Sequence, residues 1–440
     1  MSIKILDLFA GAGGLSLGFE LLRDEKGKKV FELYRAVEID KYACETLRKR
    51  YGKEVVIDGD LTKKKTHQKV IAACKGVVSI VMGGIPCQSF SMIGPRSGYG
   101  KKMEKFKQDQ RDRLYLEFKK IVDELNPNII VIENVKGILS KKDARGRKII
   151  DNIIADFEET YSFENTRNEI KYMLLNAADY GVPQRRERVI LVGINRRWKN
   201  VKVPYPEPTH AEDPEETDVY SPYVTLFDAI GDLPGVSAKI TKTDLKPKQV
   251  KQIARRNKYA RNGKDQIIYP KERLQRHLAR IETAGKRFFE FVRPNGYQFL
   301  DHHIARPQQY SDIMLFQNMR AGETAKDFTA RKPVLAKKLI KYDMSTFLDK
   351  YRKQRWNTIS TTIFAHLEKD GNRFIHPKQP RTITPREAAR LQSFPDDYIF
   401  EGPTNKKFRQ IGNAVPPLLA RSIAKSVSIC IQENQLGLKK

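Results

Sequence analysis

The 440-residue sequence predicts an α/β fold in which helices flank a mostly parallel sheet and a smaller domain is inserted. Three observations predict this class. Short apolar segments alternate with helix-like segments through the first half of the chain. These apolar segments are continuous, which is typical of strands buried on both faces. The charge then changes abruptly near residue 200, which indicates an inserted region of different character.

The strands are expected, in order, at 4–9, 31–39, 55–57, 77–82, 129–133, 172–176 and 188–194. Helix-like patterns lie between them, for example at 41–51 and 113–125, and a last helix is expected at 417–433. In sheets of this class, ligands bind beyond the carboxyl ends of the strands. The residues that follow each strand are therefore the candidates for a functional site.

The net charge is +29, from 82 Lys and Arg against 53 Asp and Glu, and it is unevenly distributed. Residues 201–240 contain 2 basic and 8 acidic residues, whereas residues 241–360 contain 28 basic and 11 acidic residues. The acidic segment also contains several prolines, so we expect a surface connector and a boundary near 195–220. A strongly basic chain indicates nucleic acid as the leading partner.

The composition excludes several classes of protein. An apolar content of 40% excludes a wholly disordered basic chain, and the longest apolar runs are too short to cross a bilayer. The N-terminus has no secretory signal pattern. The four cysteines, at 44, 74, 87 and 430, form no Cys-x-x-Cys and predict neither disulfides nor a zinc site, as expected in a reducing cytoplasm. His302 and His303 lack metal-ligand spacing, so no metal is expected.

The residues that follow the first three strands together indicate a nucleoside site. The turn Asp7-Leu8-Phe9-Ala10-Gly11-Ala12-Gly13-Gly14 would let a ligand approach the backbone, although a tight turn without a ligand would look similar. Glu38 suits a ribose diol and Asp60 an adenine amine, but each could be an ordinary surface carboxylate. No phosphate-binding loop is present, which favours S-adenosylmethionine over ATP.

Two later segments carry groups suited to covalent chemistry. Gly83-Gly84-Ile85-Pro86-Cys87 places a thiol at a strand end, where cations or helix amides could lower its pKa. The other three cysteines are interpreted as small buried hydrophobes. Glu133 ends the fifth strand, and Arg186 and Arg188 project to the same side of an extended segment. Alone, this arginine run could be a solvated basic stretch.

Six ordered motifs resemble those of the DNA (cytosine-5) methyltransferases. They are residues 7–14, Pro86-Cys87-Gln88, Glu133-Asn134-Val135, Gln184-x-Arg186-x-Arg188, Arg386-Glu387-x-x-Arg390-Leu391-Gln392 and Gln410-Ile411-Gly412-Asn413-Ala414-Val415. Each motif is modest, but six in this order are highly specific. The resemblance covers roughly 1–195 and 380–440 and implies a Rossmann-like, S-adenosylmethionine-dependent methyltransferase fold with an inserted DNA-recognition domain.

The resemblance also implies a mechanism. Cys87 would add to carbon 6 of cytosine, which makes carbon 5 able to attack the methyl group. Glu133 would bond the ring nitrogen and the exocyclic amine, Arg188 would hold the base carbonyl oxygen, and Arg186 would fix the loop and a phosphate. The target base must leave the duplex, and the Gly-containing stretch 89–107 is expected to close over it.

The implied cofactor is S-adenosylmethionine. The residues implied to bind it are Phe9, Gly11, Gly13, Glu38, Ile39, Asp60, Leu114, Asn413 and Val415. Ile39 departs from the family pattern, in which an aromatic residue often lies against the adenine. Aliphatic packing can replace that contact.

The resemblance implies three parts: a catalytic and cofactor-binding domain at 1–195, a variable DNA target-recognition region at 196–380, and closing motifs at 381–440 that return to the catalytic domain. The expected partner is duplex DNA. Candidate DNA-binding residues are Gln88, Ser91, Arg255, Arg256 and Arg355. Most other basic side chains are expected to be solvated. We expect a cytoplasmic monomer that protects DNA from a cognate restriction endonuclease without forming a stable complex with it.

Three other functions remain open at this point. An RNA cytosine-5 methyltransferase of the same fold is disfavoured by Gln88 and by the large basic insertion. A nicotinamide dehydrogenase would leave Cys87 and Glu133 without a role. The same two residues argue against a non-catalytic DNA-binding protein on this scaffold.

Overall fold

The computed structural model describes residues 2–85, 114–143, 145–167, 170–215, 219–241, 266–268, 271–294, 297–340 and 351–437. The chain forms two compact units. Unit 1 comprises Met1–Tyr180, Arg186–Thr209 and Ala414–Lys440. Unit 2 comprises Gly181–Arg185 and His210–Asn413.

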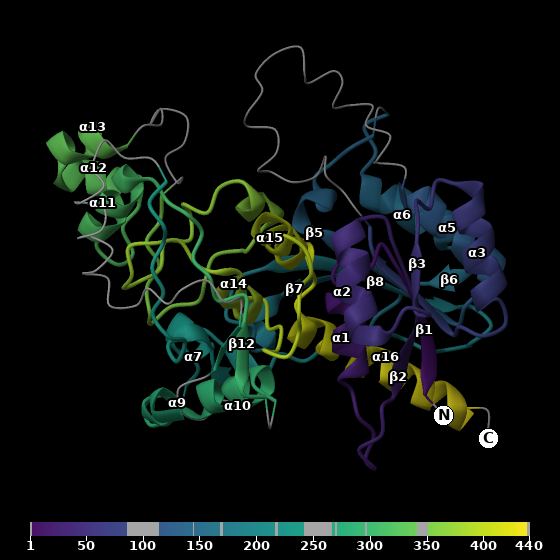
Figure 1. Ribbon diagram of the computed structural model, residues 1–440. Helices are drawn as coiled ribbons and strands as arrows, with labels where there is room; N and C mark the ends of the chain where they lie inside the picture. The colour runs from purple at the N-terminus through teal and green to yellow at the C-terminus, as the bar shows by residue number, and fades with distance from the viewer. Residues whose placement is uncertain are drawn as a thin grey trace. The chain divides into compact units, whose positions relative to one another are not determined.

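Unit 1 is built on an eight-stranded mixed sheet (Figure 1). Its strands are β1 (Ile3–Leu8), β2 (Phe31–Glu38), β3 (Val56–Asp58), β4 (Ile80–Gly84), β5 (Ile129–Val135), β6 (Tyr161–Ser162), β7 (Met173–Asn176) and β8 (Glu187–Asn195). The order is β3-β2-β1-β4-β5-β8-β6, and β7 also pairs with β8. The first five strands are mutually parallel, whereas β8 runs antiparallel to β5, β6 and β7. The predicted α/β fold class with a mostly parallel sheet is confirmed.

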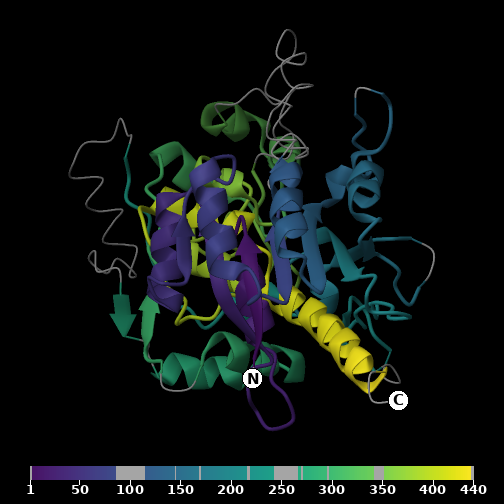
Figure 2. The same cartoon turned by 90° about the vertical axis from the view of Figure 1, so that its right-hand side faces the viewer.

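Helices cover both faces of this sheet (Figures 1 and 2). One face carries α3 (Lys64–Cys74), α5 (Leu114–Leu125) and α6 (Ile149–Phe157). Their apolar side chains form the main core with the sheet, and α5 shows the helical spacing that produces such a face, with Phe118, Ile121, Val122 and Leu125 buried. The other face carries α1 (Gly14–Glu20), α2 (Lys41–Tyr51) and α16 (Pro417–Gly437).

Local hydrogen bonds explain where individual elements begin. The Asp40 carboxylate caps α2 by accepting from the amides of Tyr42 and Ala43, at 3.0 and 3.1 Å. The fourth strand begins at Ile80 and not at residue 77 as predicted. The reason is that the amides of Val77 and Val78 both donate to the carbonyl of Cys74 and close the end of α3.

The last helix of the chain, α16, packs against the first, α1. Gly18 in α1 makes this close packing possible, because a Cβ there would overlap Ala420 and lie 2.5 Å from the carbonyl oxygen of Pro417. The stretch Thr404–Asn434 is long and apolar enough to cross a membrane by length and composition alone. It is divided between α15 (Thr404–Asn413) and α16, and 67% of its most apolar window is buried within the protein, as in a core helix.

Unit 2 contains short elements joined by long loops. They are β9 (His210–Ala211), β10 (Ser221–Pro222), α7 (Leu226–Ile230), β11 (Gln266–Ile268), α9 (Lys271–Leu278), α10 (Thr283–Val292), β12 (Phe299–Asp301), α11 (Tyr310–Asn318), α12 (Ala325–Arg331), α13 (Pro333–Leu339), a 3₁₀ helix (Ala365–Glu368), α14 (Pro385–Leu391) and α15. The three helices α11, α12 and α13 enclose their own small apolar cluster, which includes Phe316 and Phe328.

Buried ion pairs hold the centre of unit 2 together. In α14, Arg390 pairs with Asp232 and with Asp396, both at 2.6 Å, and all three side chains are fully buried. Arg381 and Glu387 form a second buried pair through two hydrogen bonds of 2.7 Å. These contacts lie within unit 2, to which residues 381–413 belong, whereas the chain from Ala414 onward belongs to unit 1.

Candidate active site

The predicted turn after β1 has the backbone geometry that its glycines suggest. Gly11 and Gly13 have φ values of 55° and 71°, and Phe9 also lies in the left-handed region at 59°. A Cβ on Gly11 would meet no atom within 4 Å, so its backbone faces open space. Helix α1 starts directly after Gly13, which directs the first amides of that helix toward the turn.

Glu38 ties this turn to the end of β2. One carboxylate oxygen accepts from the amide of Gly11 at 2.7 Å, and the other accepts from the amides of Ile39 and Asp40 at 2.9 and 2.8 Å. Burial raises the pKa of the Glu38 carboxyl above its usual value, and the three amides oppose that rise. The side chain is therefore held rigidly at the carboxyl edge of the sheet, where a diol could still donate to it.

Asp7 is a site residue that the sequence analysis did not single out. It is 1% exposed, one oxygen accepts from the Ser16 hydroxyl, and the other has no hydrogen-bond partner among the described residues. Burial raises the pKa of Asp7 to about 7, with nearby Glu38 adding to the rise. The available signal was a carboxylate inside the apolar strand Ile3–Leu8.

The other predicted cofactor residues differ in their surroundings. Ile39 is 65% exposed at the end of β2, so its aliphatic side chain is available to a flat ligand. Asp60 is half-buried and accepts from the amide and the hydroxyl of Thr62, at 2.9 and 2.8 Å. Leu114 begins α5 and Val415 is 5% exposed, both in unit 1. Asn413 is exposed at the end of α15 in unit 2.

These residues fit a ligand that combines an adenosine group with a positively charged sulfonium. The open backbone at Gly11 admits the ligand, the Glu38 carboxylate suits hydroxyl donors, and the exposed Ile39 suits an aromatic base. The buried Asp7 carboxyl, with an oxygen lacking a partner and a pKa near neutrality, suits a positively charged group.

A carboxylate–guanidinium pair lies farther along the same edge. Glu133 on β5 and Arg188 on β8 are 2.7 Å apart, and the side chain of each is 10% exposed. The antiparallel register pairs Val135 with Arg188, which places Glu133 two residues away on the neighbouring strand. Burial lowers the pKa of Arg188, and the nearby Glu133 opposes that effect, so the two side chains are paired in a largely dry position.

Two neighbours shape this pair. Gly84 is paired with Glu133, and a Cβ on it would lie 3.0 Å from the Glu133 carboxylate, so glycine leaves that carboxylate its space. Arg186 is fully buried and donates to the carbonyl of Ala414 at 2.9 Å. Burial, together with Arg188, lowers the pKa of Arg186 well below its usual value. Arg186 therefore binds the backbone where the chain re-enters unit 1.

Several predicted residues lie outside the described part of the chain: Cys87, Gln88, Ser91, Arg255 and Arg256. Cys87 follows Gly84 by three positions in sequence, and Gly84 is paired with Glu133. The other three cysteines are buried in unit 1, and burial raises the pKa of Cys44 to about 12, of Cys74 to about 11 and of Cys430 to about 12. Such thiols are poor nucleophiles at neutral pH.

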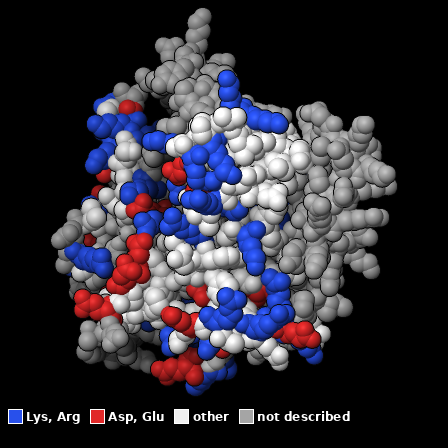
Figure 3. Space-filling view, turned by 90° about the vertical axis from the view of Figure 1, so that its left-hand side faces the viewer, with Lys and Arg blue, Asp and Glu red and all other residues white. Residues whose placement is uncertain are grey.

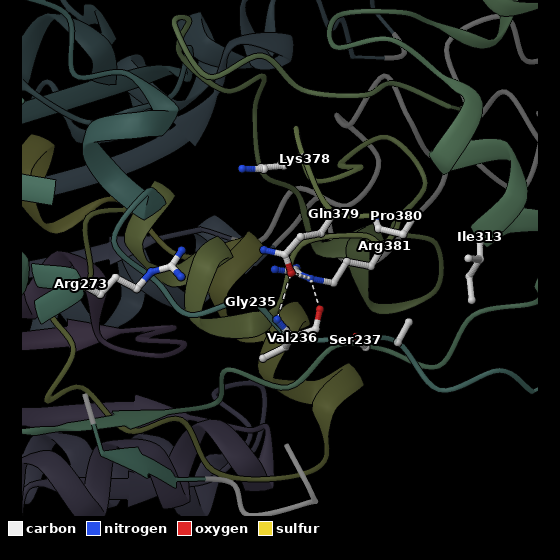
Figure 4. Close-up of a pocket in the computed structure, with 10 residues that line it drawn as sticks. Gly235, Val236, Ser237, Arg273, Ile313, Lys378, Gln379, Pro380 and Arg381 are labelled. Atoms are coloured by element: carbon white, nitrogen blue, oxygen red, sulfur yellow. Dashed lines mark hydrogen bonds between the residues drawn. The ribbon is translucent and has the colours of Figure 1, made fainter. Parts of the chain in front are cut away.

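In unit 2, Arg355 is exposed and lies over Gly322. On the face seen in Figure 3, basic and acidic side chains are interspersed and do not form one continuous basic surface. Unit 2 also contains a cavity of about 300 Å³ lined in part by Val236, Arg273, Lys378 and Gln379 (Figure 4). None of its lining residues is a predicted site residue.

The glycine turn, the acidic groups after β1 and β2 and the Glu133–Arg188 pair all lie at the carboxyl edge of one sheet, and the fold is that of the Rossmann-like methyltransferases. The chain belongs to the family of C-5 cytosine-specific DNA methylases, whose family model matches residues 3–428. It is a DNA (cytosine-5-)-methyltransferase of the type found in type II restriction–modification systems.

The chain is similar along nearly its whole length to known members. It is 32% identical to the type II methyltransferase M.NgoFVII of Neisseria gonorrhoeae over 98% of this chain and 88% of that protein. It is also 32% identical to M.XorII of Xanthomonas oryzae pv. oryzae, over 98% and 85%. A solved structure described as a DNA modification methyltransferase from an Escherichia coli prophage superposes with a TM-score of 0.60 at 23% identity, covering 98% of this chain and 100% of that one.

Proposed function

We propose that the protein transfers a methyl group to carbon 5 of a cytosine that is flipped out of a specific duplex DNA sequence, through a covalent bond between Cys87 and carbon 6. The observation that carries the proposal is the buried Glu133–Arg188 pair at 2.7 Å beside Gly84. That pair offers a carboxyl group and a guanidinium donor side by side to a base edge.

Each of these residues has one task in the proposed reaction. The Cys87 thiolate forms a bond to carbon 6, and the ring electrons that this addition displaces make carbon 5 nucleophilic. Glu133 accepts a hydrogen bond from the exocyclic amine and gives its carboxyl proton to the ring nitrogen as negative charge develops there. Arg188 donates to the base carbonyl oxygen, and its pairing with Glu133 fixes both side chains before the base arrives. After the methyl group has been transferred to carbon 5, water takes up the carbon 5 proton, the electrons left behind expel the Cys87 thiolate, and the ring nitrogen returns its proton to Glu133 as the methylated base is released.

S-adenosylmethionine, when bound, supplies the electrophilic methyl group. Glu38 would hold the ribose, Asp60 and Ile39 the adenine, and the backbone at Gly11 would lie against the ligand. Phe9, Gly13, Leu114, Asn413 and Val415 would complete this site. We also propose that the enzyme acts as a monomer in the cytoplasm, and that it protects DNA from a restriction endonuclease with the same target.

The proposed parts of the chain are the catalytic domain at 1–195, a DNA-reading region at 196–380 and the closing motifs at 381–440. The reading region contains the most basic stretch of the chain, and phosphate contacts from it would make DNA binding strongly salt-dependent. We propose that Gln88, Ser91, Arg255, Arg256 and Arg355 contact DNA.

The test is covalent trapping on duplex DNA that carries 5-fluorocytosine at the target position, after bisulfite sequencing of methylated plasmid has identified that position. Fluorine at carbon 5 cannot leave as a proton, so wild type should form a denaturant-resistant complex. Cys87→Ala should bind the DNA and form no such complex. Methylation of normal DNA without trapping would refute the covalent step, and label transfer only to RNA would refute the substrate.

A further inference from the structure

Unit 1 contains the same basic hairpin twice. The pattern Asp-x-(Lys/Arg)-Gly-(Lys/Arg)-Lys occurs as Asp24-Glu25-Lys26-Gly27-Lys28-Lys29 and again as Asp143-Ala144-Arg145-Gly146-Arg147-Lys148. We call residues 22–30 the amino-edge hairpin and residues 141–149 the carboxyl-edge hairpin. Ala144 lies outside the described residues.

The carboxyl-edge hairpin is organised by one aspartate. The amide of Asp143 donates to the carbonyl of Arg147 at 2.8 Å, and the amide of Gly146, which has a φ of 81°, donates to the carbonyl of Asp143 at 3.1 Å. The Asp143 carboxylate accepts from the amides of Arg145 and Arg147 at 2.8 and 3.0 Å, and from the side chain of Asn152 at 3.0 Å. These bonds fix the turn and leave its basic side chains outside.

The amino-edge hairpin repeats the four bonds in which backbone amides are the donors. The amide of Asp24 donates to the carbonyl of Lys28, and that of Gly27, at a φ of 73°, donates to the carbonyl of Asp24, both at 2.9 Å. The Asp24 carboxylate accepts from the amides of Lys26 and Lys28, at 3.0 and 2.8 Å. The two hairpins therefore have nearly the same shape and similar side chains.

Their positions on the sheet are opposite. The carboxyl-edge hairpin follows β5 and the 3₁₀ helix Lys136–Leu139 and leads into α6, so it stands at the edge that carries Glu133. The amino-edge hairpin lies between α1 and the start of β2, at the other end of the same strands. Figures 1 and 2 show the two hairpins projecting from opposite ends of the sheet.

The carboxyl-edge hairpin has the charge of a polyanion-binding element. Residues 141–148 contain five basic residues and one acidic residue, and Lys142, Arg145, Arg147 and Lys148 are exposed. The one negative charge is on Asp143. Its Oδ1 accepts from the backbone amides of Arg145 and Arg147, and its Oδ2 lies 3.3 Å from Nε of Arg147. The side chains of a fixed hairpin lose less entropy on binding than those of a flexible loop.

We propose that the carboxyl-edge hairpin binds the phosphate backbone of the duplex beside the target cytosine. Unit 1 thus holds the DNA itself, in addition to the contacts made by the recognition region. This inference rests on one part of the proposed function, namely that the target base binds at the edge of the sheet that carries Glu133. Contacts to phosphate carry no sequence information, so the hairpin strengthens binding to every sequence alike.

The two hairpins allow a matched experiment. Arg145→Glu/Lys148→Glu alters the carboxyl-edge hairpin, and Lys26→Glu/Lys28→Glu alters the amino-edge hairpin by the same total charge. All four side chains are exposed, and neither aspartate is changed. The Kd for target and non-target duplexes is measured from 0.05 to about 0.3 M salt, together with kcat at saturating DNA.

Loss of two phosphate contacts should flatten the slope of log Kd against log salt by about 1.8, and should weaken binding about 60-fold at 0.1 M salt. The carboxyl-edge variant should show this change for both duplexes, with kcat retained and the amino-edge variant close to wild type. Equal weakening by both variants would mean that only net charge matters, and wild-type affinity in the carboxyl-edge variant would refute the contact. If wild type still forms the covalent complex with 5-fluorocytosine DNA, either result overturns this inference and leaves the proposed function intact. If wild type neither forms that complex nor methylates DNA, the proposed function is overturned.

Discussion

The buried Asp7 carboxyl should make the ligand-free protein less stable as the pH rises, and Asp7→Asn should remove this effect. The amide has almost the same shape and can still accept from the Ser16 hydroxyl, but it carries no charge to desolvate. The substitution therefore isolates the free-energy cost of an ionised group that is buried near the end of β1, just before the glycine turn.

The magnitude follows from the pKa of Asp7, which burial raises from 3.8 to about 7. Below pH 3.8 the carboxyl is protonated in both the folded and the unfolded protein and contributes nothing. Above that pH the unfolded chain ionises first, so the folded state loses stability until about pH 7. The full loss is about 4 kcal/mol, and about 2–3 kcal/mol of it develops between pH 5 and pH 8.

The assay is urea unfolding of both proteins at a series of pH values, with the difference in unfolding free energy taken at each pH. Other carboxylates are common to both proteins and cancel in this difference. The variant should gain about 2–3 kcal/mol over wild type between pH 5 and pH 8. Ser16→Ala removes a hydrogen bond that lowers the pKa of Asp7, so its loss of stability should extend to higher pH. A difference between Asp7→Asn and wild type that does not change with pH would refute the reasoning.

Three further outcomes are expected. Glu133→Gln should lower single-turnover methyl transfer by about 10²–10³-fold while the Kd for DNA stays within about threefold, and unchanged turnover would contradict its role at the base. Gly18→Ala should lower the free energy of unfolding by about 2 kcal/mol, and adding Ala420→Gly should restore part of this loss; thermal unfolding of the single and double variants measures it. Arg390→Met should cost about 3–5 kcal/mol in urea unfolding because it leaves Asp396 buried without its partner, and a neutral effect would show that the pair is dispensable.

The rule that ligands bind beyond the carboxyl ends of parallel strands located much of the candidate site in the sequence. Glu38 ends β2 and Glu133 lies two residues before the end of β5, and residues near the carboxyl ends of parallel strands share one edge of the sheet whatever the loops between them do. The contact between Glu133 and Arg188 was less accessible, because it depends on an antiparallel register between strands about fifty residues apart in sequence. The burial of Asp7 depends on neighbours from several strands and helices, and the sequence indicates it locally only by placing a carboxylate inside an apolar strand.

The unit in which residues 381–413 pack was inaccessible from the sequence for the same physical reason. The motif around Arg390 resembles a catalytic-domain motif in sequence order, but its side chain is fixed by Asp232, which lies 158 positions earlier in unit 2. A buried arginine packs in the unit that supplies its carboxylate partners, and sequence order does not show which unit that is.

The two basic hairpins show why position matters more than local sequence for function. Their residues and hydrogen bonds are nearly the same, so composition and local geometry assign them the same role. Only the direction of the strands distinguishes them, because one hairpin follows the carboxyl end of β5 and the other precedes the amino end of β2. Within unit 1, basic residues therefore indicate DNA binding only where the fold brings them to the edge at which the base is modified. We expect basic residues at the opposite edge to contribute to the net charge of +29 but not to the affinity for DNA.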